Sequence, residues 1–208
     1  GAMTVTGAIG STANAYKLAL VGNKAITLSS ATNTLSTIAS ASGLGALSIT
    51  NSQALTIGSM TIGGTTYSGL SSTGTILVQT STGNLTVSNA VTTTSTSAVT
   101  TAPAIKLAAD YDGTTSDTAH NIILANSDSS LITAGSNAII ALYSGAPLSS
   151  TNLSAFTAGQ TTNFITYSKT TSDTQSASSG YYLKYRGTQP TMYVIFGSSD
   201  TPTYGSAP

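Results

Sequence analysis

The sequence repeats one short theme: an alternating apolar segment, a small polar turn, and a second alternating apolar segment. The theme reads LALVGNKAITL from Leu18, ALSITNSQALTI from Ala46 and ILVQTSTGNLTV from Ile76. Every second side chain is apolar, which is the period of a β-strand with one buried face. The pattern predicts strands at Lys17–Val21, Ala25–Leu28, Ala46–Thr50, Ala54–Ile57, Met60–Ile62, Thr75–Gln79, Asn84–Val87, Ile105–Ala108, Asn121–Ala125, Leu131–Ile132 and Ala138–Tyr143.

Two all-β architectures produce such a pattern, an antiparallel β-sandwich and a parallel β-solenoid. The self-similar segments favour the solenoid, because each of its rungs occupies an equivalent position. The scarcity of charge also favours the solenoid. The 208 residues include 6 Lys plus Arg, 6 Asp and no Glu, whereas there are 39 Thr and 33 Ser. Rungs stack about 4.8 Å apart, where a repeated charge would face its own sign while hydroxyls can hydrogen-bond along the ladder. We therefore predict a solenoid with roughly 20 residues per rung.

Composition excludes several functional classes. A formal net charge of zero without a basic cluster argues against nucleic-acid binding. No apolar run approaches the roughly 20 residues of a membrane helix, so no membrane span is expected. The absence of Cys excludes disulfide scaffolds and thiolate zinc sites, and a single His, His120, cannot build a multi-His metal site. A hydrophobic fraction of 39% argues against disorder.

The densest group of acids lies in the segment DYDGTTSD, which contains Asp110, Asp112 and Asp117. Its Asp-x-Asp-Gly start is similar to that of a calcium loop, so these three are the candidate metal ligands. The third Asx and the closing Glu of a calcium loop are missing. We therefore expect a solvated excursion loop near 110–120, with no metal and no cofactor.

Enzymes on β-helices need paired carboxylates, or an acid with a basic partner. Asp110 and Asp112 are spaced to share one face of a strand, and Asp128 is the other acid considered for such a pair. His120 can be matched with Asp117 and many serines, but with 33 serines such a match carries little information. We expect a hydrogen-bonded turn histidine and no enzyme, with a polysaccharide-acting enzyme as the least favoured alternative.

Aromatic residues concentrate near the C-terminus, where residues 163–197 hold seven of the thirteen in the chain. Strand alternation in YYLKYR separates a buried face, with Tyr181, Leu183 and Tyr185, from an exposed one, with Tyr182, Lys184 and Arg186. An exposed Tyr beside two cations can bind sugars or acidic groups, so Tyr182, Lys184 and Arg186 are the candidate ligand-binding residues. The stretch equally suits a cap over the last rung, predicted near 138–143, and capping is the favoured interpretation.

Several segments together resemble one family, the filamentous-haemagglutinin-like adhesins that Gram-negative bacteria export by two-partner secretion. They are the GNLTV-type rungs, AIIALYSGAP at 138–147, YYLKYRGTQPTMYVIF at 181–196 and TPTYG from Thr201. The resemblance implies a right-handed parallel β-helix followed by an aromatic segment, in a secreted or cell-surface protein with an outer-membrane export partner. It implies no catalytic residues.

These observations give the following organisation. Residues 1–3, GAM, are similar to the remnant of a protease-cleavage site. Residues 4–147 are expected to form the rungs, residues 148–200 an aromatic capping region, and residues 201–208 a linker to a further domain. The predicted fold class is therefore an all-β, right-handed parallel β-helix (β-solenoid) with an aromatic β-rich C-terminal cap. The expected role is a rigid, monomeric stalk segment that contributes to attachment. The alternative is a module that binds a host or neighbour-cell glycan or receptor.

Overall fold

The computed structural model describes residues 1–11, 15–113, 118–160, 162–171 and 178–191. The described chain is all-β, with 44% of it in strands and 5% in helix. No described helix has the length and apolar character needed to cross a membrane.

Three sheets in which every strand pair is parallel make up most of the molecule. The first sheet has the order β1 (Met3–Val5), β3 (Ile26–Leu28), β5 (Leu47–Asn51), β10 (Ile76–Thr80), β15 (Ile105–Ala108), β18 (Ile139–Ser144), β20 (Gly180–Tyr185) and β19 (Asn163–Thr166). The second has the order β16 (Ile122–Leu124), β11 (Leu85–Val87), β6 (Leu55–Ile57), β4 (Leu35–Ser40) and β2 (Tyr16–Leu20). The third has the order β17 (Ile132–Thr133), β12 (Val91–Thr93) and β9 (Leu70–Ser72). These parallel pairs exclude the antiparallel sandwich for the main sheets.

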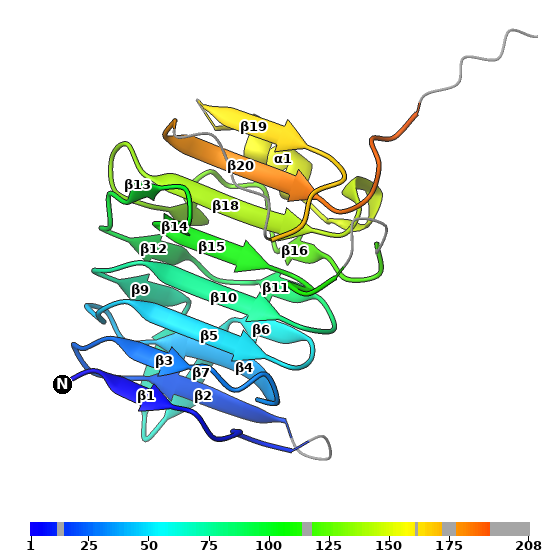
Figure 1. The fold of residues 1–208 in the computed structure, drawn as a ribbon. Coiled ribbons are helices and arrows are strands. Elements are labelled where there is room, and N and C mark those ends of the chain that lie inside the picture. The colour runs from blue at the N-terminus through cyan, green and yellow to red at the C-terminus, as the bar shows by residue number, and fades with distance from the viewer. Residues whose placement is uncertain (12–14, 114–117, 161, 172–177, 192–208) are drawn as a thin grey trace, which may run out of the picture.

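From β5 to β18 the chain passes through the first, second and third sheets in that order, and each circuit places its strands beside those of the circuit before (Figure 1). The earlier strands β1 to β4 belong only to the first two sheets. In the first sheet the in-register residues are Ile26, Leu47, Ile76, Ile105 and Ile140, which gives circuits of 21, 29, 29 and 35 residues. Most are longer than the expected 20 residues, because excursions leave the sheets. Two of these excursions are antiparallel hairpins. The first pairs β7 (Ser59–Ile62) with β8 (Thr65–Ser68), and the second pairs β13 (Ala98–Val99) with β14 (Ala102–Pro103). The 60–62 strand therefore forms, but outside the three parallel sheets.

The core lies between the sheets and consists of stacked aliphatic columns. One column contains Leu28, Ile49, Val78, Leu107, Leu142 and Leu183, all buried and in register. Their alternation with outward Thr, Ser and Lys residues is the period-two pattern of the sequence. Each such side chain contributes about 2 kcal/mol when it is removed from water.

Buried amides and hydroxyls occupy the corner between the first and second sheets. The Asn51 amide donates to the Leu35 carbonyl and its Oδ1 accepts the Leu35 N–H, while Asn33 donates to the Thr50 carbonyl. Thr80 donates to the Gly83 carbonyl and accepts the Asp110 N–H. Because buried backbone groups need partners, these corners require neutral groups that can both donate and accept. This requirement explains part of the Asn and Thr content and the scarcity of charge.

The chain closes the stack after β18 by folding back on it. The short helices η1 (Pro147–Ser149) and α1 (Leu153–Ala158) follow β18, and the Leu124 N–H donates to the Thr151 carbonyl beyond the end of the second sheet. Leu153 and Phe156 of α1 are buried in the core. The chain then forms β19 and returns as β20, which inserts between β18 and β19. The first sheet thus continues from the rung region into the capping region across residue 147.

Candidate functional site

The predicted ligand-binding face of β20 is buried, which corrects the expectation that it is exposed. Tyr182, Lys184 and Arg186 have exposed fractions of 4%, 3% and 1%. Strand alternation is present, because Leu183 and Tyr185 belong to the core and Tyr181 packs against it. The opposite face is also covered, in part by described residues between β19 and β20: the Thr171 carbonyl accepts a hydrogen bond from Lys106 and the Ser178 carbonyl accepts one from Tyr182. Strand alternation predicts a solvent-exposed face opposite the core. No local sequence signal indicates that other residues of the chain cover this face.

Arg186 lies at the centre of a polar cluster with Asp110 and His120, in which the Arg186 and Asp110 side chains are buried and that of His120 is 31% exposed. Its Nη2 is 3.4 Å from Asp110 Oδ2, and His120 Nδ1 is 3.5 Å from the same oxygen. Arg186 also donates to three backbone carbonyls, those of Ala109, Asp110 and His120. The guanidinium therefore joins the end of β20 to both sides of the 110–120 excursion. The proximity of these three residues is not predictable from local sequence, because 66 or more residues separate Arg186 from the other two.

The carboxylates of the 110–120 excursion lie in different environments. Asp110 is 5% exposed, so the expectation of a solvated loop is wrong for this residue, whereas Asp112 is exposed. Asp110 has a left-handed backbone, with φ of 56°, a conformation that Asp tolerates better than most residues. Asp117 lies outside the described residues. Within the described chain, no group of three His, Cys, Asp or Glu side chains is arranged to hold a metal ion.

A second group of cations lies on the outer face of the first sheet. Lys106 Nζ is 5.1 Å and Lys184 Nζ 5.3 Å from the centre of the Tyr143 ring, within the range of cation–π attraction. Lys106 also donates to the Thr171 carbonyl, and its burial lowers the pKa of the ammonium below its ordinary 10.5. Sequence reasoning missed Lys106 and Tyr143 as partners of Lys184. Their proximity is visible only once the ladder is known, because Tyr143 is in register with Lys184 while Lys106 is in register with Ala141, two residues before Tyr143.

Tyr182 is held by an aromatic stack and a hydrogen bond. Its ring is 4.6 Å from that of Phe164 on β19, with 15° between the planes. Its hydroxyl donates to the Ser178 carbonyl at 2.7 Å. The side chains of Tyr182, Lys184 and Arg186 thus all contact protein groups, and binding of an external ligand by them stays an untested prediction.

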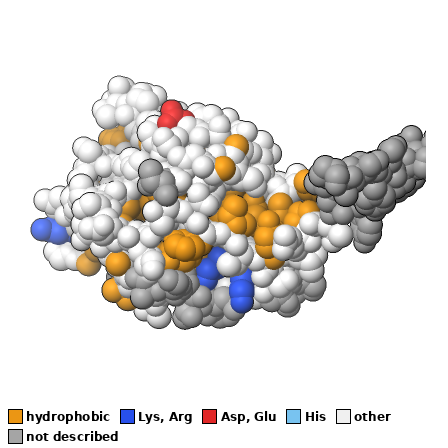
Figure 2. Space-filling view, turned by 90° about the horizontal axis from the view of Figure 1, so that it is seen from above, with side chains coloured by type: hydrophobic (Ala, Val, Ile, Leu, Met, Phe, Trp, Pro, Cys, Tyr) orange, Lys and Arg blue, Asp and Glu red, His pale blue; other side chains and the backbone are white. Residues whose placement is uncertain are grey.

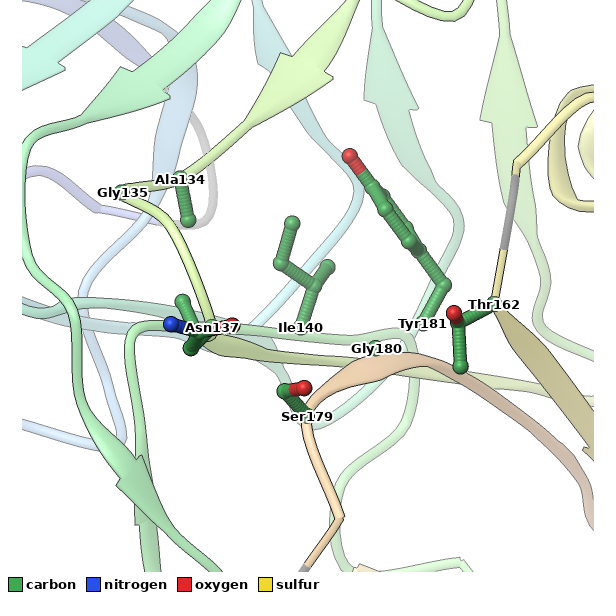
Figure 3. Close-up of a pocket in the computed structure, with 9 residues that line it drawn as sticks. Ala134, Gly135, Asn137, Ile140, Thr162, Ser179, Gly180 and Tyr181 are labelled. Atoms are coloured by element: carbon green, nitrogen blue, oxygen red, sulfur yellow. The ribbon is translucent and has the colours of Figure 1, made fainter.

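A cavity of about 230 Å³ opens beside the start of β20. In Figure 3 Ile140 and Tyr181 stand side by side and face the Ala134–Gly135 segment, with Asn137 and Ser179 lower in the same cavity. The Tyr181 hydroxyl donates to the Ile132 carbonyl, and burial raises the pKa of this tyrosine. Uncharged amide, hydroxyl and backbone groups line the cavity, so it suits a small neutral polar group.

Comparison with known proteins identifies no relative: no family model, curated protein or solved structure matches the chain.

Proposed function

We propose that the chain is a segment of a right-handed parallel β-helix that acts as a rigid stalk in a large exported adhesin. The resemblance to filamentous-haemagglutinin-like proteins, carried by the GNLTV-type rungs and by residues 138–147, 181–196 and 201–205, supports this role. It also supports a secreted or cell-surface location in a Gram-negative bacterium and an outer-membrane export partner.

The observation that carries the proposal is the unbroken eight-strand ladder of the first sheet. Seven spacings of about 4.8 Å give an axis of about 34 Å, along which every neighbouring pair of strands is bonded through backbone groups. Stacked aliphatic columns run along the same axis, so each circuit is stabilised by its neighbours on both sides. At each interface between neighbouring strands, a force along this axis is shared among the backbone hydrogen bonds that join the two strands.

The polar clusters also favour a structural role over catalysis. Arg186 and Asp110, which are buried, form a cluster with the partly exposed His120 and with backbone carbonyls as further partners. Lys106 and Lys184 lie over an aromatic ring. Such contacts fix chain segments in place. We therefore propose that the protein is not an enzyme.

Mechanical unfolding tests the stalk. The chain is tethered through its two ends in series with a helical domain of similar mass, which serves as the internal control. The chain should unfold at clearly higher force than the helical domain. Unfolding at equal or lower force would contradict the stalk role.

One observation favours the alternative, a glycan-binding module: the cavity lined by Asn137, Thr162 and Ser179 next to Tyr181. Its volume is below the ~300–1,000 Å³ typical of larger ligand sites, which limits it to about one neutral sugar unit. A glycan array probed with the labelled chain separates the two functions. Binding that Asn137→Ala abolishes and Asn126→Ala retains would favour the module, and an array without binding would favour the stalk.

A further inference from the structure

A groove lies between the β13–β14 hairpin and the outer face of the first sheet. It has a volume of about 250 Å³ and is located at the starting ends of the strands, beside the hairpin (Figure 1). Its wall includes Ala102 and Pro103 of the hairpin. Its floor is one outward row of in-register side chains, namely Thr27, Ser48, Leu77 and Lys106. The groove is therefore mostly apolar, with hydroxyl groups at one end of the floor and a cation at the other.

Lys106 is a half-buried cation with no acidic partner among the described residues. Charge is sparse in this chain, and most side chains at the end of the molecule seen in Figure 2 are uncharged. Of the three N–H donors of the ammonium, one bonds the Thr171 carbonyl at 3.2 Å, and the group also lies over the Tyr143 ring. Burial lowers the pKa of Lys106, because the lost solvent no longer stabilises the charged form. A carboxylate would supply both an acceptor and the missing negative charge.

The dimensions of the groove favour a linear ligand with its charge at one end. Neighbouring strands are about 4.8 Å apart, so the three spacings from Lys106 to Thr27 cover about 14 Å. Between these ends the floor and the wall present Leu77 and Pro103, which suit an alkyl chain. An apolar cavity of about 150 Å³ accepts benzene. The larger volume here, about 250 Å³, therefore fits a medium-length chain.

We propose that this groove binds a linear medium-chain monocarboxylate, whose carboxylate contacts Lys106 and whose alkyl chain lies between Leu77 and Pro103 and extends toward Ser48. The stalk function does not require this site. The groove lies on the outer face, away from the backbone hydrogen bonds of the ladder, so the two proposals can fail independently.

Isothermal titration calorimetry with octanoate tests the proposal. Octanoate should bind at a single saturable site. Butanoate should bind roughly tenfold more weakly or worse, because its shorter chain buries less apolar surface. Octan-1-ol has the same chain length without the charge, and it should also bind roughly tenfold more weakly.

Two variants locate the site. Lys106→Met keeps an unbranched side chain without the charge, so it should weaken octanoate binding roughly tenfold and change octan-1-ol binding little. Ser48→Phe places a bulky side chain on the floor of the groove and should abolish binding of both ligands. The matched controls are Lys17→Met, at an exposed lysine of β2, and Thr86→Phe, at a half-buried outward position of β11 in the second sheet. Both controls should bind octanoate as the parent does.

Several outcomes would overturn the proposal. Absence of saturable octanoate binding to the parent chain would do so, and so would unchanged binding by Ser48→Phe. Octan-1-ol that binds as tightly as octanoate would show that the groove does not recognise a carboxylate. Circular dichroism melts of each variant establish that a loss of binding does not reflect unfolding. If Lys106→Met does not fold, the two ligand comparisons and Ser48→Phe still decide the question.

Discussion

At the scale of single residues, Arg186 is the side chain on which the cap most depends. Its guanidinium contacts Asp110 and three carbonyls while it is almost fully buried. Removing one partner of a buried pair leaves an uncompensated charge and costs about 3–5 kcal/mol. We expect Arg186→Leu to lower the free energy of unfolding by this amount in urea denaturation. Asp112→Asn, an exposed acid of the same excursion, is the matched control and should change it by less than about 0.5 kcal/mol.

The substitution Arg186→Lys distinguishes the contribution of the positive charge from that of the guanidinium geometry. A lysine keeps the positive charge but lacks the planar fork that contacts several carbonyls at once. If Arg186→Lys were as stable as the parent, the fork geometry would be irrelevant and charge alone would hold the segment. We expect it to recover less than half of the loss.

Buried tyrosines in the capping region make its stability decrease at alkaline pH. Burial raises the pKa of Tyr185, the nearby Tyr167 raises it further, and a hydrogen bond with Ser154 partly offsets both. A tyrosine with a raised pKa contributes stability that is present below the unfolded value of about 10 and is lost as pH rises through the folded value. Lys106 acts in the opposite direction, because its lowered pKa penalises the protonated form and this penalty disappears as pH rises.

We therefore expect Tyr185→Phe to reduce the loss of stability above pH 10. Urea denaturation between pH 8 and pH 11 checks this, with Tyr67→Phe on the β7–β8 hairpin as the control. Identical pH profiles for Tyr185→Phe and the parent would show that Tyr185 does not set the limit.

At the scale of elements, the two faces of β10 differ in what they contribute. Ile76 points into the core and is fully buried, whereas its neighbour Leu77 lies on the outer face and is half-buried. Ile76→Ala removes buried methyl groups and leaves a cavity, so it should cost about 2–5 kcal/mol in the free energy of unfolding. Leu77→Ala should cost clearly less in the same denaturation experiment. Equal losses would mean that the outer face is packed as tightly as the core.

The sequence predicts most strands, but it does not predict which residues pack against their outer faces. Alternating apolar residues located β5, β10 and β15 to within a residue or two, because period two is a local property. The strands β4, β9 and β12 were missed, since LSTIAS, LSS and VTT contain too few apolar residues for the pattern. Helix α1 was also missed, because LSAFTA is short and has no acidic residue in its first turn and no basic residue in its last. Its Phe156 ring packs against the Tyr181 ring, with 5.8 Å between the ring centres, and this contact is not local in the sequence. The Arg186 cluster depends on a contact across 66 residues that no local pattern encodes.

At the scale of the whole molecule, we expect the segment after β18 to determine whether the stack of strands ends or associates with another molecule. Without it, β18 would present six unpaired backbone positions and the core side chains Ile140 and Leu142 would lose the cover of Tyr181 and Leu183. Such an exposed strand edge would pair with the same edge of a second molecule. The net charge of zero would give little electrostatic repulsion between the two copies.

A chain truncated after Ala146 should therefore form oligomers or aggregate, and its melting temperature should fall. The loss includes several buried aromatic and aliphatic side chains at about 2 kcal/mol each, which is comparable to the net stability of a domain. Size-exclusion chromatography with light scattering measures the mass, and thermal melts followed by circular dichroism measure the stability. Tyr16→Ala on the exposed β2 edge, far from the cap, serves as the control and should remain monomeric. A truncated chain that is also monomeric, with an unchanged melting temperature, would mean that residues 147–191 do not cap the stack, and the search for a ligand of Tyr182, Lys184 and Arg186 would then come first.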